Sequence, residues 1–112
     1  MVRKRIPKKV EREIERYLNI LKEDSLPINK VFLFGSFARG LQHKWSDIDL
    51  CVISPKFKDS FEASQYLWKK RKIFDINYTI EPVGFSLKDF NDKYNSLASE
   101  IKRTGVEIEM RF

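Results

Sequence analysis

The sequence has 112 residues, 42% of them hydrophobic, which suffices for one domain spanning residues 1–112 and leaves no room for a separate substrate-binding domain. Lysine and arginine (22) outnumber aspartate and glutamate (16), and the net charge of +6 favours anionic partners. Cys51 and His43 are the only residues of their types, which excludes multi-thiolate zinc sites and histidine-based triads. The absence of a membrane-length apolar run predicts a soluble intracellular protein without a membrane partner.

The first half of the chain predicts a helix followed by two strands. Apolar residues recur every three or four positions over residues 10–21, which is typical of an amphipathic helix beginning near Pro7. The apolar run 31–34 is typical of a short buried strand. Apolar and polar positions alternate over residues 48–52 and predict a second strand, while residues 37–40 are long enough for only about one helical turn.

The second half predicts two further helical regions and two further strands. Residues 59–72 have a loosely helical apolar pattern, and residues 74–81 alternate as a strand that Pro82 is expected to end. A capping box predicts a helical region from residue 86 to Gly105, followed by a last strand over 106–110. This order favours an α/β (α+β) fold with a mixed β-sheet and helices packed mainly on one face. The pattern does not determine which strands pair.

Two aspartates carry the first chemical signal. Asp47 and Asp49 are two residues apart on a predicted strand, so both carboxylates project from one face with Cα atoms roughly 6.5 Å apart. Because like charges repel, such a pair needs a cation, and carboxylate oxygens suit Mg²⁺ or Mn²⁺ better than zinc. Cys51 is expected in the core, on the face opposite the aspartates.

The turn before these aspartates has the features of a phosphate-binding segment. Gly35 allows a tight turn after the first strand, and Ser36 can offer its hydroxyl and nearby backbone N–H groups to a phosphate. Arg39 contacts the triphosphate or pairs with a nearby carboxylate, and the sequence does not decide between the two. A phosphate cradle beside a divalent metal is what phosphoryl or nucleotidyl transfer requires.

The arrangement Gly35-Ser36, ten residues, then Asp47-Ile48-Asp49 resembles the GSx₁₀DxD signature of the DNA polymerase beta-like nucleotidyltransferase superfamily. The short chain is similar to minimal nucleotidyltransferases over residues 7–112, and in particular to antitoxins paired with HEPN-domain toxins. This resemblance implies a nucleotidyltransferase fold and the transfer of AMP from Mg²⁺-bound ATP to a tyrosine of the partner toxin. It does not imply nucleic acid as the direct substrate, and it leaves open whether the chain forms a homo-oligomer.

The superfamily pattern also implies a third carboxylate on a later strand, where it completes the metal site and acts as base. Counting back four positions from Glu81 gives Asn77, whose amide cannot act as a base, whereas counting from the basic run 69–72 gives Asp75. Asp75, Asn77 and Glu81 share one face by parity, so the sequence leaves all three open for this position. We predict Asp75. The candidate site residues are therefore Gly35, Ser36 and Arg39 for nucleotide binding, and Asp47, Asp49 and Asp75 for catalysis and metal binding.

Two alternative functions remain at this point. If Asn77 occupies the third position, the chain is a catalytically impaired antitoxin that binds nucleotide and partner without turnover. The charge of +6 also suggests a basic nucleic-acid-binding module. This last hypothesis ranks lowest because no base-reading or stacking motif accompanies the basic runs.

Overall fold

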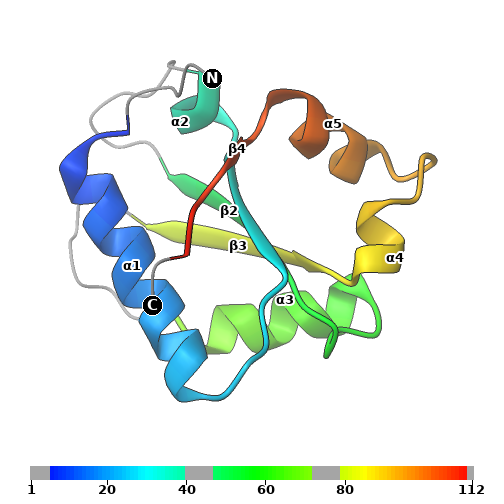
Figure 1. The fold of residues 1–112 in the computed structure, drawn as a ribbon, viewed down its shortest axis with the longest axis horizontal. Coiled ribbons are helices and arrows are strands. Elements are labelled where there is room, and N and C mark those ends of the chain that lie inside the picture. Colours follow the sequence, from blue (N-terminus) through cyan, green and yellow to red (C-terminus); the bar gives the residue numbers. More distant parts are fainter. Residues whose placement is uncertain (1–5, 40–46, 72–78, 111–112) are drawn as a thin grey trace.

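The computed structural model describes residues 6–39, 47–71 and 79–110, which form one sheet flanked by helices (Figure 1). In chain order the elements are α1 (Lys8–Glu23), β1 (Lys30–Phe34), α2 (Ser36–Arg39), β2 (Ile48–Ile53), α3 (Ser60–Lys69), β3 (Ile80–Phe85), α4 (Leu87–Phe90), α5 (Ser96–Thr104) and β4 (Val106–Glu107). The sheet has four strands in the order β3-β2-β1-β4. Strand β1 is antiparallel to β2 and β4, whereas β3 is parallel to β2. The predicted mixed sheet is confirmed.

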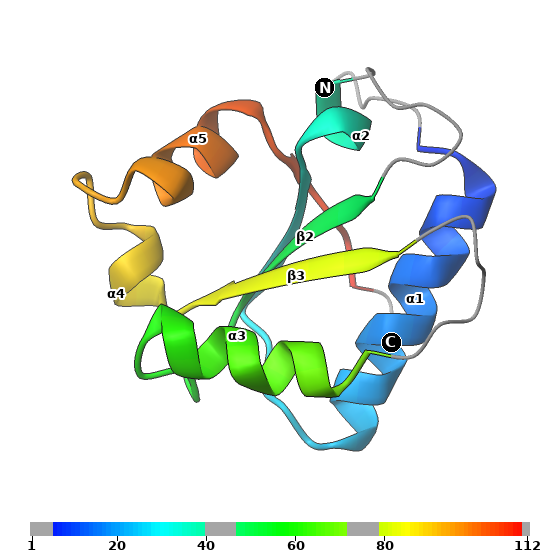
Figure 2. The ribbon, with the colours of Figure 1, turned by 180° about the vertical axis from the view of Figure 1, so that it is seen from behind.

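Helices cover both faces of the sheet, with the two longest on the same face. One core cluster joins α1, α2 and α3 to the sheet, and a smaller cluster joins α4 and α5 to the opposite face. Figures 1 and 2 show α1 and α5 on opposite sides of the strands. Within the described segments, no helix has both the length and the apolar character needed to cross a membrane.

Helix α1 is the amphipathic helix that the sequence predicts, and it follows Pro7 directly. Its apolar stripe is buried against the sheet because these positions share one face of a 3.6-residue repeat. The buried apolar side chains of the stripe are Val10, Ile14, Tyr17, Leu18 and Leu21. The Tyr17 hydroxyl also donates a 2.7 Å hydrogen bond to the carbonyl of Leu67. This bond ties α1 to the C-terminal half of α3.

The alternation along β2 separates its two faces. Leu50 and Val52 belong to the cluster under α1 and α3, whereas Cys51 and Ile53 belong to the cluster under α4 and α5. Cys51 is fully buried, as expected, but the expected face is wrong. Because side chains two positions apart share a face of a strand, Cys51 lies on the same face as Asp49.

Strand β3 differs from the prediction at Pro82. Residues 74–78 of the predicted strand lie outside the described residues, and β3 continues through Pro82 to Phe85. The N–H of Ile48 donates to the carbonyl of Thr79, and the N–H of Ser54 donates to that of Phe85. The odd-numbered residues of β3 therefore bond to β2, and Pro82 faces the open edge. Since no ladder bond needs its missing N–H, proline is tolerated there.

The predicted helical region after β3 is divided into two helices. Ser86 caps α4 by accepting a 3.1 Å hydrogen bond from the N–H of Asp89, which confirms the predicted capping box position. Helix α5 begins anew after Asn95, whose side chain accepts from the N–H of Ala98. Each helix thus has its own side-chain cap, because the turn between them interrupts the helical hydrogen bonds.

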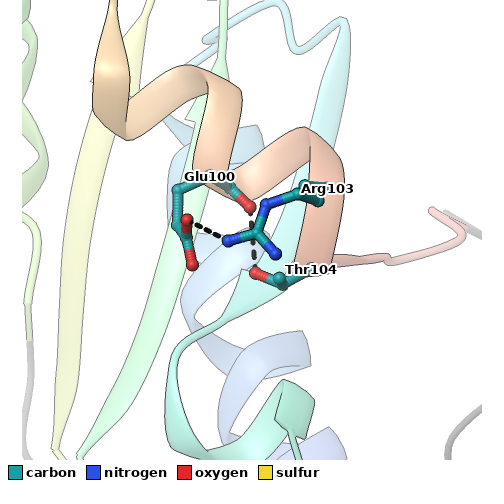
Figure 3. Close-up of polar contacts among 3 residues, drawn as sticks. All are labelled: Glu100, Arg103 and Thr104. Atoms are coloured by element: carbon teal, nitrogen blue, oxygen red, sulfur yellow. Dashed lines mark hydrogen bonds and ion pairs between the residues drawn. The ribbon is translucent and has the colours of Figure 1, made fainter.

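The last turn of α5 is held by polar contacts within the helix (Figure 3). Arg103 donates to the Glu100 carboxylate at 2.6 Å, and the Thr104 hydroxyl donates to the Glu100 carbonyl at 2.9 Å. Gly105 follows, as the sequence predicts for a helix stop, and β4 then pairs with β1 over two residues. The predicted last strand is therefore shorter than residues 106–110, although the N–H of Ile108 still bonds to the carbonyl of Val31.

Candidate active site

Gly35 forms the turn between β1 and α2. Its φ of +73° lies in the left-handed region that side chains disfavour. A Cβ atom at this position would also overlap Oδ2 of Asp49 and lie 3.0 Å from its Cγ. Glycine is therefore needed twice, for the backbone conformation and for the space that the Asp49 carboxylate occupies. Ser36 follows Gly35 directly and begins α2.

Asp49 lies between two strands that bring different side chains to it. It pairs with Phe34 on antiparallel β1 and with Glu81 on parallel β3. Paired residues of neighbouring strands point to the same face, so the Asp49 and Glu81 carboxylates lie side by side. Asp47 precedes β2 and is exposed, whereas Asp49 and Glu81 are partly buried. The site is therefore an acidic row at the beginning of β2, formed by Asp47, Asp49 and Glu81.

The environment of Asp49 raises the pKa of its carboxyl group above the usual value. Burial is the largest cause, followed by the negative charges of Glu81 and Asp47 and by a hydrogen bond with Glu81, and together they raise the Asp49 pKa to about 6. A cation beside these carboxylates would offset the free-energy cost of ionising Asp49. Carboxylate oxygens are the ligands that Mg²⁺ and Mn²⁺ prefer, so the donor chemistry fits a divalent metal. Within the described part of the chain, no three such side chains converge on one point.

The structure brings together four of the residues that the sequence selects. Gly35 and Ser36 lie at the turn beside Asp49, and Asp47 is two residues from it. The Arg39 side chain, Asp75 and Asn77 lie outside the described residues. Glu81 is one of three residues, with Asp75 and Asn77, that the sequence leaves open for the third carboxylate, although the predicted residue is Asp75. Its parity with Asp75 indicates the correct face, but only the parallel register with β2 shows that it is opposite Asp49.

The model of the nucleotidyltransferase domain family matches residues 14–106, which include the turn at Gly35 and all three acidic residues of the row. The chain belongs to this family. The predicted family relationship is therefore confirmed for most of the sequence. A comparison of this chain with curated protein sequences found no match.

Solved structures resemble this nucleotidyltransferase domain in fold at low sequence identity. A toxin-antitoxin structure with AMP-PNP is 21% identical, with a TM-score of 0.54 over 83% of this chain and 69% of the other. A mutant of the toxin-antitoxin MntA-HpeT is 19% identical, with a TM-score of 0.54 over 85% and 70%. A Sulfolobus solfataricus protein assigned as a nucleotidyltransferase is 19% identical, with a TM-score of 0.60 over 93% and 86%. The predicted fold class is confirmed.

Proposed function

We propose that this nucleotidyltransferase domain transfers AMP from ATP to a hydroxyl group of a partner protein and thereby acts as an antitoxin. The proposed acceptor is a tyrosine of a HEPN-domain toxin, and the proposed compartment is the cytoplasm, where ATP and Mg²⁺ are available. One observation carries the proposal: Asp49 lies between the turn at Gly35, which we propose binds phosphate, and the carboxylate of Glu81. This arrangement joins a place for phosphate to a place for a divalent cation.

The proposed metal is Mg²⁺ or Mn²⁺, held by Asp47, Asp49 and a third carboxylate. Glu81 supports this role through its position opposite Asp49, and Asp75 remains the prediction from the sequence. The bound metal would neutralise phosphate charge and favour ionisation of the attacking hydroxyl. These carboxylates suit that role because burial, followed by the charges of Glu81 and Asp47, raises the Asp49 pKa, and a cation would offset both effects.

The protein groups have separate parts in the proposed reaction. Ser36 and the backbone N–H groups after Gly35 bind the triphosphate, with Arg39 as a further candidate contact. The third carboxylate accepts the proton of the attacking hydroxyl. The hydroxyl oxygen forms a bond to the α-phosphorus as the bond from that phosphorus to the bridging oxygen breaks, and pyrophosphate leaves with the electron pair.

The fold relatives support the choice of nucleotide and partner. One toxin-antitoxin structure contains AMP-PNP, an ATP analogue, and a second is the MntA-HpeT pair. Both resemble this domain in fold. They are the reason for preferring ATP over other nucleotides and a toxin over other protein acceptors.

Calorimetric titration of ATP, with and without Mg²⁺, tests the nucleotide site. We expect Mg²⁺-dependent binding in the wild type and its loss in the double variant Asp47→Asn/Asp49→Asn. The double variant Asp59→Asn/Glu100→Gln is the matched control, because it removes the same charge at the N-cap of α3 and in α5, outside the acidic row. Equal binding by the wild type and the Asp47/Asp49 variant would refute the proposed site.

Transfer is tested with ATP labelled at the α-phosphate and candidate HEPN-domain toxins. We expect label on the toxin and release of pyrophosphate, both dependent on Mg²⁺ and on Asp49. If nucleotide binds but no toxin is labelled, while the Asp47→Asn variant still neutralises the toxin, the domain acts by binding alone. The observation that favours this second candidate is the amide of Asn77 at one of the positions open for the third carboxylate.

A further inference from the structure

The outer edge of β3 carries a specific contact from α3. Odd-numbered residues of β3 bond to β2. The carbonyl of Pro82 therefore points outward from the open edge of the sheet, away from β2. The indole Nε1–H of Trp68 donates a 3.1 Å hydrogen bond to this carbonyl. A helix side chain thus supplies the partner that a further strand would otherwise provide.

The indole of Trp68 is fixed from a second direction. The N–H of Arg71 bonds to the Trp68 carbonyl at 3.3 Å, closing the turn at the end of α3. This turn brings the Arg71 guanidinium over the Trp68 ring, 4.0 Å from its centroid. Trp68 is 44% exposed, but its ring is held by the cation–π contact with Arg71 and its N–H by the hydrogen bond to β3.

The position of this bond along β3 relates it to the acidic row. Pro82 follows Glu81 directly, and Glu81 is the partner of Asp49 in the register. The close packing of α3 against β3 lies further along the strand, at Gly84, where an added Cβ would be 2.6 Å from that of Ala63. The Trp68 bond therefore anchors the end of β3 that carries the acidic side chain.

We propose that Trp68 is a positioning residue for the nucleotidyltransferase site, and that its indole N–H holds the backbone at Pro82 so that Glu81 stays opposite Asp49. The expected effect of Trp68 on metal binding rests on the proposed function. Its effect on the backbone at Pro82 does not. Trp68 itself acts through the strand from the face opposite the Glu81 side chain, because even-numbered residues of β3 pack toward α3.

The test compares Trp68→Phe with the wild type. Phenylalanine retains an aromatic ring for Arg71 and removes the N–H donor together with the five-membered ring that carries it. The control is Phe61→Leu, since Phe61 is on the same helix and is 73% exposed. Amide hydrogen exchange by NMR reports on the backbone at Glu81 and Val83, and Mn²⁺ titration without nucleotide reports on the acidic row.

We expect exchange at Glu81 and Val83 to rise roughly fivefold in Trp68→Phe, as loss of one hydrogen bond implies. We expect Mn²⁺ affinity to fall by about tenfold, the lower end for loss of an outer partner of a metal ligand. Phe61→Leu should match the wild type, and the melting temperature of Trp68→Phe should fall by no more than about 8 °C, as loss of one hydrogen bond implies.

Unchanged exchange at both amides in Trp68→Phe would overturn the positioning role, as would faster exchange combined with wild-type Mn²⁺ affinity. Failure of the wild type to bind Mn²⁺ would instead refute the metal site of the proposed function. In that case the exchange rates alone decide the structural claim about Trp68. The two failures are therefore distinguishable.

Discussion

Replacing Asp49 by asparagine should stabilise the metal-free protein at neutral pH. The Asp49 pKa is raised from 3.8 to about 6, first by burial and then by the charges of Glu81 and Asp47. A shift of about 2 units corresponds to about 3 kcal/mol, and solvent screening at this partly exposed carboxylate reduces the cost to about 1 to 2 kcal/mol. Asparagine keeps the shape of the side chain and removes the charge, so this cost should disappear.

The direction of the Asp49 pKa shift determines the pH range over which the variant and the wild type differ in stability. Below about pH 4 the Asp49 carboxyl is protonated in both the folded and the unfolded chain, so the variant and the wild type should have similar stability. As pH rises, the unfolded chain loses this proton first, and the folded wild type is progressively destabilised until pH passes about 6. The advantage of Asp49→Asn should therefore appear between about pH 4 and pH 6 and remain constant above.

Urea denaturation in EDTA across pH 4 to 8 measures this difference in the free energy of unfolding. Asp47→Asn is the matched control, because Asp47 is exposed, and its effect should stay below about 0.5 kcal/mol. Mg²⁺ should stabilise the wild type and leave Asp49→Asn nearly unchanged. If Asp49→Asn is less stable than the wild type at pH 8, or if the difference does not vary with pH, the assigned electrostatics are wrong.

Three further substitutions test the backbone and packing. Gly35→Ala should lower stability by about 1 to 2 kcal/mol through its φ of +73° and abolish Mg²⁺-ATP binding by displacing Asp49, which calorimetry would detect. Gly84→Ala should cost about 1 to 3 kcal/mol in urea denaturation, because its Cβ would lie 2.6 Å from that of Ala63; an unchanged midpoint would contradict this packing. Ser25→Gly should raise stability by up to about 1 kcal/mol, since Ser25 has a φ of 62°, and a lower melting temperature would argue against strain there.

Local patterns were enough for the elements that depend on neighbouring residues. The stripe of α1 follows from one amphipathic repeat, and the Ser86 cap of α4 follows from a four-residue motif. The turn at Gly35 and the pair Asp47 and Asp49 were also visible, because a fixed spacing in the chain brings them together. Such features need little tertiary information, since each is decided within a few residues or by one family motif.

The neighbours of Asp49 could not be derived in the same way. Parity placed Glu81 on the correct face of its strand, but only the parallel pairing of β2 and β3 sets it opposite Asp49. The same pairing directs the Pro82 peptide to the open edge, where proline continues the strand and its carbonyl meets Trp68. The sequence by itself determined the helical periodicity and the acidic motif. Tertiary structure alone decided which acidic groups share the site, because strand order and register depend on packing between segments distant in the chain.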